Sequence, residues 1–393
     1  MPQICLYFEL HQPLRLAPVP LTTIGSEVPS YFRLTERDDN KVIFSKVAKK
    51  SYYPMLRLLR ELLATEPKFT FALSLSGVFL DQAQAYEPEL IVLLQSLVKT
   101  GRVELLSETY YHSLASLYSN TEFAAQIAQH KKMLKKLFGV VPTVFRNTEL
   151  IYSNAIAEQV AKLKYIGMLT EAVPRYLGDR PPTQVYQSAT KSQLHLLLKQ
   201  AQLSDDIAFR FSDRSWKWFP LSVRQYLEWF KSYGPSECVN LFMDFETFGE
   251  HQWEETGIFE FFTAFVSDAI HNEQYVFVTP STALQTKSAG VYDVPKPISW
   301  ADVDRDLTAW TGNALQQDTL RIIYSLEEKI IATKNAALLA DWRFLQTSDH
   351  FYYMCTKWSA DGDVHAYFSP YDSPFEAYRQ YAVVLAHLLE RLE

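Results

Sequence analysis

Carboxylates are the reactive side chains that this sequence supplies in greatest number, with 45 Asp and Glu among 393 residues. Several of them follow short apolar segments that are typical of buried strands. Glu149 follows the segment 143–145, and Asp244 and Glu246 follow the segment 239–242. Two carboxyl groups that flank a glycosidic bond are the usual machinery of glycoside hydrolysis. The residue types therefore point first to nucleophilic and acid–base chemistry on sugars.

The spacing of these carboxylates limits which of them can act as a pair. Asp244 and Glu246 lie two residues apart, so on an extended chain they face the same way. Two parallel carboxyl groups on one strand are poorly placed to flank a sugar ring from opposite faces. We expect one of them to act together with Glu149, which follows a neighbouring strand directly.

Other kinds of catalytic site lack their sequence signals. There is no G-x-S-x-G elbow for a serine nucleophile, no H-E-x-x-H motif, and no G-x-G-x-x-G or Walker A phosphate loop. The nine His residues do not pair at metal-ligand spacing. Cys5, Cys238 and Cys355 fit neither a zinc site nor a disulfide framework. We therefore expect no metal in the site.

Composition and charge restrict the class of protein further. Apolar residues make up 48% of the chain and charged residues 21%, which is ordinary for a globular protein with a sizeable core. A net charge of -7 without a basic stripe argues against nucleic acid as a partner. No apolar run approaches membrane-spanning length, so we expect no membrane partner. No signal peptide is visible, and we expect a cytoplasmic protein.

Short apolar segments alternate with helical patterns up to residue 285. We expect strands at Ile4–Leu10, Phe69–Leu75, Val103–Leu106, Thr143–Phe145, Tyr165–Leu169, Ile207–Phe211, Val239–Phe242 and Tyr275–Thr279. We expect helices between them at Ser51–Thr65, Thr121–Phe138, Asn154–Lys164 and Leu221–Tyr233. Such alternation forms βαβ units with a parallel sheet. The pattern predicts a closed or nearly closed β/α barrel, with an open doubly wound sheet as the alternative.

The character of the sequence changes after residue 285. Gly and Pro residues mark residues 286–297 as a linker, and the patterns beyond it are helical. We expect these helices at Asn313–Thr333, Asn335–Phe344 and Ser373–Leu392. The predicted domains are thus a catalytic barrel over residues 1–285, and a linker with a helical domain over residues 286–393. In β/α barrels the site lies at the carboxyl ends of the strands, where the carboxylates of this chain fall.

Five ordered segments of the chain resemble the five motifs of glycoside hydrolase family 57. They are His11-Gln12-Pro13, Gly101-x-Val103-Glu104, Phe145–Tyr152, Asp244–His251 and Thr347–Met354. The stretch Ser299-Trp300-Ala301-Asp302, with Arg305 and Trp310, also resembles α-amylase-type members of the family. The similarity spans nearly the whole chain, and five motifs in the right order are highly specific.

The resemblance implies an incomplete (β/α)7 barrel followed by a helical domain that contributes to the site. It implies action on α-1,4-glucans such as starch, glycogen and maltooligosaccharides, with retention of anomeric configuration and without a metal or organic cofactor. It assigns Glu149 as the nucleophile and Asp244 as the general acid/base. Transferase-type members tend to carry Trp where this chain has Arg146, and this difference favours the α-amylase-like branch.

Further residues are expected to bind the sugar. The candidates are His11, Glu104, Glu246, His251, Trp300, Asp302, Arg305, Trp310 and Asp349. Trp216 and Trp218 are additional candidates for stacking on glucose rings, and we expect a structural role for His112. Retention predicts that the carboxyl groups of Glu149 and Asp244 lie about 5–5.5 Å apart. We expect the negative charges of Glu149 and Glu246 to raise the pKa of Asp244.

Three other functions stay open at the level of sequence. A 4-α-glucanotransferase or a glycogen branching enzyme would use the same two carboxyl groups, with a sugar hydroxyl in place of water. A metal-dependent carbohydrate hydrolase, such as a deacetylase or an α-mannosidase, would require the ligand pattern that is missing here. A non-catalytic glucan-binding protein would not require two intact carboxylates.

Overall fold

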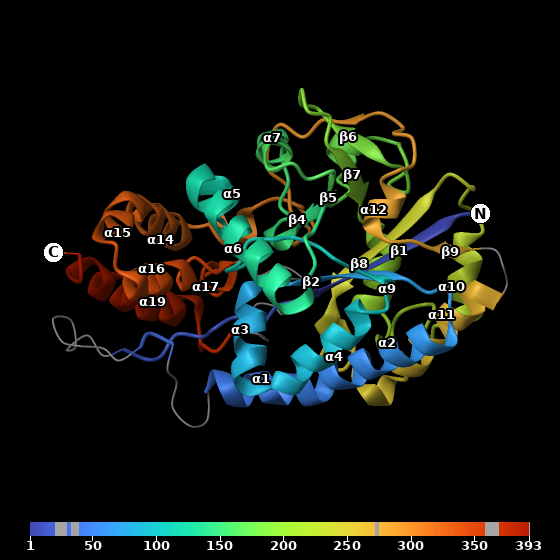
Figure 1. The fold of residues 1–393 in the computed structure, drawn as a ribbon, viewed down its shortest axis with the longest axis horizontal. Coiled ribbons are helices and arrows are strands. Elements are labelled where there is room, and N and C mark those ends of the chain that lie inside the picture. Colours follow the sequence, from blue (N-terminus) through green and yellow to red (C-terminus); the bar gives the residue numbers. More distant parts are fainter. Residues whose placement is uncertain (20–29, 33–38, 272–274, 358–368, 393) are drawn as a thin grey trace.

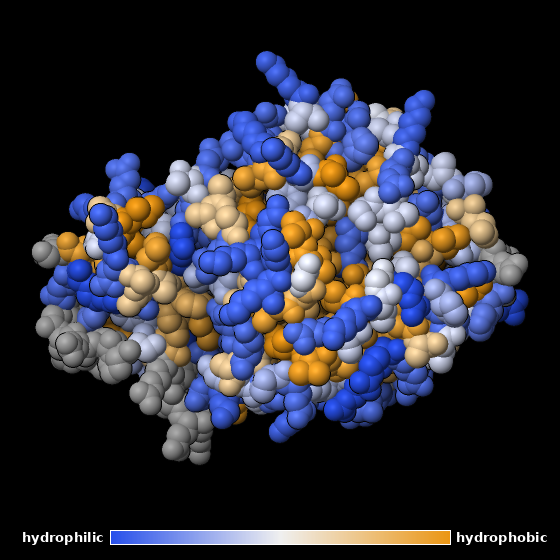
Figure 2. Space-filling view, viewed as in Figure 1, coloured by the Kyte–Doolittle hydropathy of each residue, from blue (hydrophilic) through white to orange (hydrophobic). Residues whose placement is uncertain are grey.

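The computed structural model describes residues 1–19, 30–32, 39–271, 275–357 and 369–392. Figure 1 shows the strands and their surrounding helices on one side of the molecule and the C-terminal helices gathered at the other. Among the described residues no helix is both long enough and apolar enough to cross a bilayer. The face drawn in Figure 2 carries hydrophilic side chains around its outline, with hydrophobic ones recessed between them.

Seven parallel strands form the wall of an incomplete barrel. Their bounds are β1 Gln3–Leu10, β2 Phe71–Leu75, β3 Val103–Leu105, β4 Val144–Arg146, β5 Gly167–Thr170, β7 His195–Leu198 and β8 Cys238–Asp244. They follow one another in the order β8-β1-β2-β3 and β4-β5-β7. A parallel bridge between Ser107 and Phe145 joins the two runs. The chain therefore adopts the (β/α)7 barrel that its motifs imply, not the open doubly wound sheet.

The barrel is left open between β7 and β8. Among the described residues these two strands share no ladder, and single hydrogen bonds connect them instead. The backbone N–H of Gln200 donates to the carbonyl of Asn240 at 2.8 Å, and the Asn240 side chain donates to the carbonyl of Leu198 at 2.9 Å. The chain between the two strands is accordingly free to form helices and loops beside the barrel mouth.

Three short strands lie outside this wall. They are β6 Tyr186–Ser188, antiparallel to β7, β10 Val291–Tyr292, parallel to β6, and β9 Val276–Phe277, beside the start of β1. Because β10 pairs with β6, part of the segment 286–297, which we expected to be a linker, is a short strand beside the barrel wall. The boundary between two domains at residue 285 stays a prediction.

The expected strand at Ile207–Phe211 is wrong. Residues up to Ala208 belong to the helix α9 Ala201–Ala208, whose buried positions Leu203 and Ile207 are four residues apart. This spacing is that of one helix face, and it outweighs the local apolar character. The strand of this region is β7, which we did not predict because its short run of leucines directly follows a polar stretch.

Helices surround the strands of the barrel. They are α1 Asn40–Val47, the π-helix η2 Ala48–Tyr52, α2 Tyr53–Thr65, α3 Gly77–Tyr86, α4 Pro88–Val98, α5 Ala115–Tyr118, α6 Asn120–Phe138, α7 Asn154–Lys162, α8 Pro174–Leu177, α10 Val223–Phe230, α11 Ile258–His271 and α12 Pro280–Ala283. Helix α6 shows how the sequence sets these bounds. The Ser119 side chain accepts from the N–H of Glu122 at the start, and Gly139 takes a left-handed φ of 72° at the end.

The C-terminal region is helical, as expected. Its helices are α13 Thr308–Thr311, α14 Ala314–Ser325, α15 Glu327–Thr333, α16 Ala336–Phe344, α17 Ser348–Tyr352 and α19 Pro374–Glu390. Trp342 and Tyr381 of these helices belong to the same buried cluster as Phe145 and Tyr152 of the barrel. The helical region therefore packs on the half of the barrel that carries β4.

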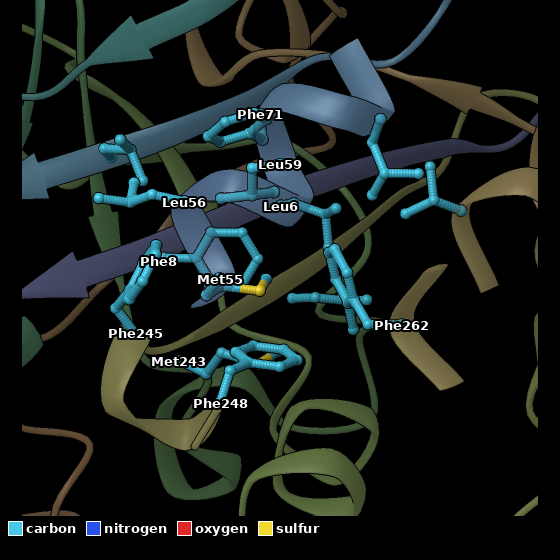
Figure 3. Close-up of a cluster of buried hydrophobic side chains, with 14 of the residues drawn as sticks. Leu6, Phe8, Met55, Leu56, Leu59, Phe71, Met243, Phe245, Phe248 and Phe262 are labelled. Atoms are coloured by element: carbon cyan, nitrogen blue, oxygen red, sulfur yellow. The ribbon is translucent and has the colours of Figure 1, made fainter. Parts of the chain in front are cut away.

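Side chains of the strands alternate between this outer packing and the barrel interior. On β1, Leu6 and Phe8 face outward and pack against α2 and α11 (Figure 3). The ring centroids of Phe8 and Phe262, which is on α11, lie 6.0 Å apart. Cys5 and Tyr7 belong to a separate cluster inside the barrel. The period of two residues thus decides which side chain of each strand points inward.

Candidate active site

The inward-facing series of each barrel strand ends in a polar residue at the carboxyl edge. On β1 the series Cys5, Tyr7 continues to Glu9, and on β8 Phe242 continues to Asp244. The register pairs Glu9 directly with Asp244. The same alternation on the other strands leads to Ser74, Glu108, Arg146, Glu171 and Lys199. Seven strands therefore converge on a set of charged and hydroxyl groups above an apolar barrel interior.

A cavity of about 1140 Å³ opens over this edge. Its lining contains all the catalytic and sugar-binding residues expected from the sequence except Glu104, Trp310 and the additional stacking candidates Trp216 and Trp218. The expected residues that line it are His11, Glu149, Asp244, Glu246, His251, Trp300, Asp302, Arg305 and Asp349. The structure thus brings both proposed catalytic carboxylates into one cavity with most of the proposed sugar-binding residues.

Glu149 lies just beyond β4 in the short 3-10 turn η3 Thr148–Leu150. Its φ of 56° and the φ of 50° at Leu150 are both in the left-handed region, which ordinary residues rarely adopt. Strained backbone of this kind persists where the surrounding structure holds it, and it gathers at functional sites. The turn directs the Glu149 carboxylate into the cavity.

Three donors hold the Glu149 carboxylate. Trp300 Nε1 donates to Oε2 at 2.8 Å, Ser348 Oγ donates to Oε1 at 3.4 Å, and His112 Nε2 lies 3.4 Å from Oε1. Burial by itself would raise the pKa of Glu149, but the hydrogen bond from His112 and the charges of His112 and Arg146 lower this pKa below its ordinary value. Glu149 is therefore ionised at neutral pH, as a nucleophile must be.

Asp244 has the opposite electrostatic character. Burial raises the pKa of its carboxyl group to about 6, and the negative charge of Glu149 adds to the increase. The increase agrees with our expectation, but its main cause does not, because burial contributes more than charge. Glu246 adds little because its own pKa is raised well above the ordinary value, by burial and then by Asp244. Two carboxyl groups with pKa values moved apart are typical of a nucleophile and a proton donor.

A charged network lies beneath these two carboxylates. Arg146 Nη1 lies 2.7 Å from Glu9 Oε2, and His112 Nδ1 lies 3.2 Å from Glu108 Oε2 and 3.4 Å from Glu9 Oε1. Burial would lower the pKa of His112, but the hydrogen bonds to Glu108 and Glu149 raise it to about 10. His112 is therefore a cation in contact with Glu149, in addition to the structural role that we expected.

Glu9, Glu108 and His112 also form a group whose ligand atoms all lie within 4.8 Å of one another. This spacing alone would suit a metal ion. However, Arg146 already provides a cation 2.7 Å from Glu9, and Ser74 Oγ donates to Glu108 at 2.6 Å. Glu9 Oε2 and Glu108 Oε1 are engaged with partners outside the group, and Arg146 brings a positive charge against it, so the group fits an ion-pair network better than a metal centre.

His11 connects the barrel to the helical region. Its Nε2 lies 3.1 Å from Oδ2 of Asp349, which is on α17, and its Nδ1 lies 2.7 Å from Oγ of Ser76. The His11 ring stacks on the His112 ring with centroids 4.0 Å apart. Burial and the positive charge of His112 lower the pKa of His11, so this ring is neutral at neutral pH.

Trp300 and Arg305 also line the cavity. The Trp300 ring carries two cations near it, with Arg146 Cζ and Lys199 Nζ each 5.3 Å from its centroid. Arg305 donates to the carbonyl of Trp300 and lies 3.4 Å from Oδ2 of Asp205. Trp300 is therefore fixed by its neighbours and by its bond to the Glu149 carboxylate.

Asp302, Glu246 and His251 complete the expected set. Asp302 Oδ2 accepts from Lys357 Nζ at 2.8 Å. Glu246 Oε1 accepts from Tyr52 Oη at 2.5 Å, and Tyr52 closes the π-helix η2, a kind of distortion that recurs at functional sites. Burial lowers the pKa of His251 to about 4, which leaves its ring uncharged.

The structure places Glu104 and Trp310 away from the cavity. Glu104 lies on the inward face of β3 four residues before Glu108, and its carboxylate accepts from the N–H of Ser281 at 2.9 Å. It therefore lies deeper in the barrel than the carboxyl edge. Trp310 is 1% exposed and packs on Tyr352 inside the helical region. Trp216 and Trp218 line a different cavity.

Sequence reasoning missed several residues of the network. Glu9, Glu171 and Lys199 line the edge but belong to no motif that we recognised, and Arg146 was noted only as a difference from transferases. A usable signal was present, because each of these residues lies two positions after an inward-facing residue of its strand and therefore also faces inward. That signal requires knowing which alternate residues face inward, and continuous apolar strands do not reveal this.

An incomplete β/α barrel whose cavity holds one carboxylate with a lowered pKa and one carboxyl group with a raised pKa has the fold and site of a glycoside hydrolase. The chain belongs to glycosyl hydrolase family 57, whose family model matches residues 5–295. A protein of Methanocaldococcus jannaschii with the name "Putative alpha-amylase" is 39% identical over 394 residues, covering 97% of this chain and 83% of that protein. An alpha-amylase of Pyrococcus horikoshii is 30% identical over 95 residues, covering 24% of this chain and 14% of that protein.

Solved structures share the fold. A family 57 branching enzyme from Thermococcus kodakaraensis superposes with a TM-score of 0.70 at 14% identity, covering 98% of this chain and 88% of that one. An alpha-amylase from Thermotoga maritima superposes with a TM-score of 0.61 at 14% identity, and the match covers 98% of this chain and 97% of that one. A 4-alpha-glucanotransferase from Thermococcus litoralis gives 0.58 at 17% identity. The match to that transferase covers 92% of the present chain but only 51% of the transferase chain.

Proposed function

We propose that this protein is a retaining, α-amylase-like hydrolase of α-1,4-glucans that uses Glu149 as nucleophile and Asp244 as general acid/base. The observation that carries the proposal is the opposite direction of the pKa shifts of these two carboxyl groups in one cavity. The pKa of Glu149 is lowered, and that of Asp244 is raised to about 6. The substrate class is inferred from the alpha-amylase name of a relative that matches almost the full chain.

In the first step the Glu149 carboxylate attacks the anomeric carbon of the bound sugar. The glycosidic carbon–oxygen bond breaks, and Asp244 donates its proton to the departing oxygen. The product of this step is a glycosyl ester on Glu149 and a released sugar with a free hydroxyl. His112 keeps the attacking carboxylate ionised before the step.

In the second step the Asp244 carboxylate removes a proton from water. The resulting hydroxide attacks the anomeric carbon, the ester bond to Glu149 breaks, and Asp244 is protonated again. Two displacements at the same carbon restore its original configuration. A sugar hydroxyl in place of water would give the transferase or branching reaction, which is our alternative function.

Polar groups around the cavity are proposed to hold sugar hydroxyls. These are His11, Glu246, His251, Asp302, Arg305 and Asp349. Neutral His11 and protonated Glu246 both donate and accept hydrogen bonds, which matches the hydroxyl groups of glucose. At the rim, Phe209, Phe219 and Trp253 are 56%, 40% and 55% exposed and offer apolar faces to the rings. No metal or organic cofactor takes part in these steps, and three buried thiols suit a cytoplasmic setting.

The assignment is tested with maltoheptaose and amylose, with products followed by chromatography. We expect shorter oligosaccharides from the wild type and at least a thousandfold loss in Glu149→Gly and Asp244→Ala, since nucleophile and acid/base variants remove most of the catalysis. Longer products beside shorter ones would favour the transferase. No turnover of either glucan by the wild type would overturn the substrate class.

Azide separates the two roles. Azide added to Glu149→Gly is expected to attack the anomeric carbon directly and to yield a glycosyl azide of inverted configuration. In Asp244→Ala, with an activated aryl glycoside, azide replaces water in the second step and yields the retained configuration. The reverse pattern would exchange the two assignments.

A further inference from the structure

A second cavity of about 740 Å³ lies beside the active site, over the helices α9 and α10. Three tryptophans line it: Trp216, Trp218 and Trp229. Trp218 is 38% exposed, and the other two are partly exposed. Their rings meet edge to face. The ring centroid of Trp229 lies 6.2 Å from that of Trp216 and 5.6 Å from that of Trp218. The three rings pack on one another, yet they leave aromatic surface open to solvent.

Polar side chains accompany these rings. Asp206 is 2% exposed and lines the cavity, and its Oδ1 accepts from Arg210 Nε at 2.6 Å. Its Oδ2 is buried and has no hydrogen-bond partner among the described residues. A buried carboxylate oxygen without a partner costs free energy, which a hydroxyl donor in the cavity would offset. Gln202 and Glu228 add further planar polar groups at the edge.

This combination of groups matches one kind of ligand. The axial C–H groups of glucose rings pack on aromatic faces, and their hydroxyls bind carboxylates, guanidinium groups and amides. The cavity volume falls within the range of about 300–1,000 Å³ that is typical of small-ligand sites. An aliphatic ligand would leave Oδ2 of the Asp206 carboxylate unpaired.

The second cavity also adjoins the first. Phe209, Arg214 and Phe219 line the catalytic cavity, while Arg210, Trp216 and Trp218 of the same segment line the tryptophan cavity. The segment 208–219 is therefore a wall with one cavity on each side. A polymer that leaves the active site over this wall reaches the tryptophans, whereas a short oligosaccharide ends before it.

We propose that the tryptophan cavity is a second α-glucan-binding site that retains long chains beside the catalytic cavity. This inference rests on the proposed function for the choice of sugar. It assigns Trp218 as the exposed stacking platform and Asp206 as the acceptor of a glucose hydroxyl. Its effect is on polysaccharides, because only they are long enough to occupy both cavities.

The test measures retention of inactive protein in gels that contain glycogen. Glu149→Gln is the parent, so turnover does not remove the ligand. We expect Trp218→Ala in this background to weaken the apparent affinity for glycogen about tenfold, the factor equivalent to one aromatic contact of about 1.4 kcal/mol. Asp206→Asn, which keeps the side-chain shape and the acceptor for Arg210, is expected to weaken it severalfold. Phe375→Ala is the control, since Phe375 is 67% exposed on α19 and lines neither cavity.

A second readout uses the active enzyme. We expect Trp218→Ala to reduce kcat/KM for amylose relative to kcat/KM for maltotriose, mainly through KM. Retention of the Trp218→Ala protein equal to that of its parent, or no retention of the parent, would overturn the inference. Failure of the proposed function has a different signature, because wild-type protein would then bind glycogen through Trp218 without turning over any α-glucan.

Discussion

The indole nitrogen of Trp300 lies 2.8 Å from Oε2 of Glu149, and the backbone N–H of Trp300 also donates to the carbonyl oxygen of Glu149 at 3.2 Å. A segment that follows the barrel strands thus holds the proposed nucleophile at both its side chain and its backbone. The left-handed φ of Glu149 persists because this clamp supports it.

Trp300→Phe removes the indole donor and keeps an aromatic ring beside Arg146 and Lys199. We expect kcat to fall about tenfold to a hundredfold with little change in KM, because the loss affects the orientation of the Glu149 carboxylate. Steady-state kinetics on maltoheptaose measure this split. Trp342→Phe is the matched control, since Trp342 Nε1 donates to a carbonyl at 2.8 Å far from the cavity. Unchanged kcat in Trp300→Phe would contradict the positioning role.

The pH profile of kcat/KM follows from the two carboxyl groups. Activity requires ionised Glu149 and protonated Asp244. It therefore rises as the pH increases through the pKa of Glu149, which is below 4.5, and it falls as the pH increases through the pKa of Asp244, which is about 6. We expect a bell with an acidic optimum. A profile that still rises between pH 6 and pH 8 would rule out Asp244 as the proton donor.

His112→Gln keeps a hydrogen-bond donor beside Glu149 but removes the positive charge. We expect the pKa of Glu149 to rise, which moves the acidic limb of the profile toward neutral pH and narrows the bell. The basic limb, which belongs to Asp244, moves less. Rates measured in steps of half a pH unit distinguish this outcome from a uniform loss of activity, which would indicate a purely structural His112.

Gly249→Ala tests the loop that follows β8. Gly249 has a φ of 102°, and a Cβ there would lie 2.0 Å from the carbonyl oxygen of Lys50 in η2. We expect a loss of roughly 2 kcal/mol or more in unfolding free energy, measured by denaturant titration, because both the backbone and the contact must shift. Gly139→Ala is the control, as its φ of 72° is similar but its Cβ would meet nothing within 4 Å. A loss of about 1 kcal/mol is expected there. Equal losses would show that the contact with Lys50 is unimportant.

The barrel was predictable because its strands are apolar, short and regularly spaced. Even so, Ile207–Phe211 was wrong, since the helical period of Leu203 and Ile207 prevailed over a local apolar run. The strand β7 was missed because its leucines follow the polar residues 190–193. Local composition does not reveal tertiary pairing of this kind.

The candidate site was predictable where a residue lies in an ordered motif, as Glu149 and Asp244 do. The network under them was not, because the roles of Glu9, Arg146 and Lys199 depend on which face of each strand is inside. Trp310 shows the opposite error. It lies in a recognisable stretch, but the helical region buries it against Tyr352.

The open seam between β7 and β8 has a consequence for how such enzymes diversify. Along most of the wall an insertion must preserve the ladder of hydrogen bonds between neighbouring strands. Residues 199–237 connect β7 to β8, and these two strands share no ladder among the described residues. Lengthening a surface connection adds only a small closure entropy. This stretch borders both cavities, so it is where natural variation or protein engineering can reshape substrate choice while the barrel and its carboxylates stay intact.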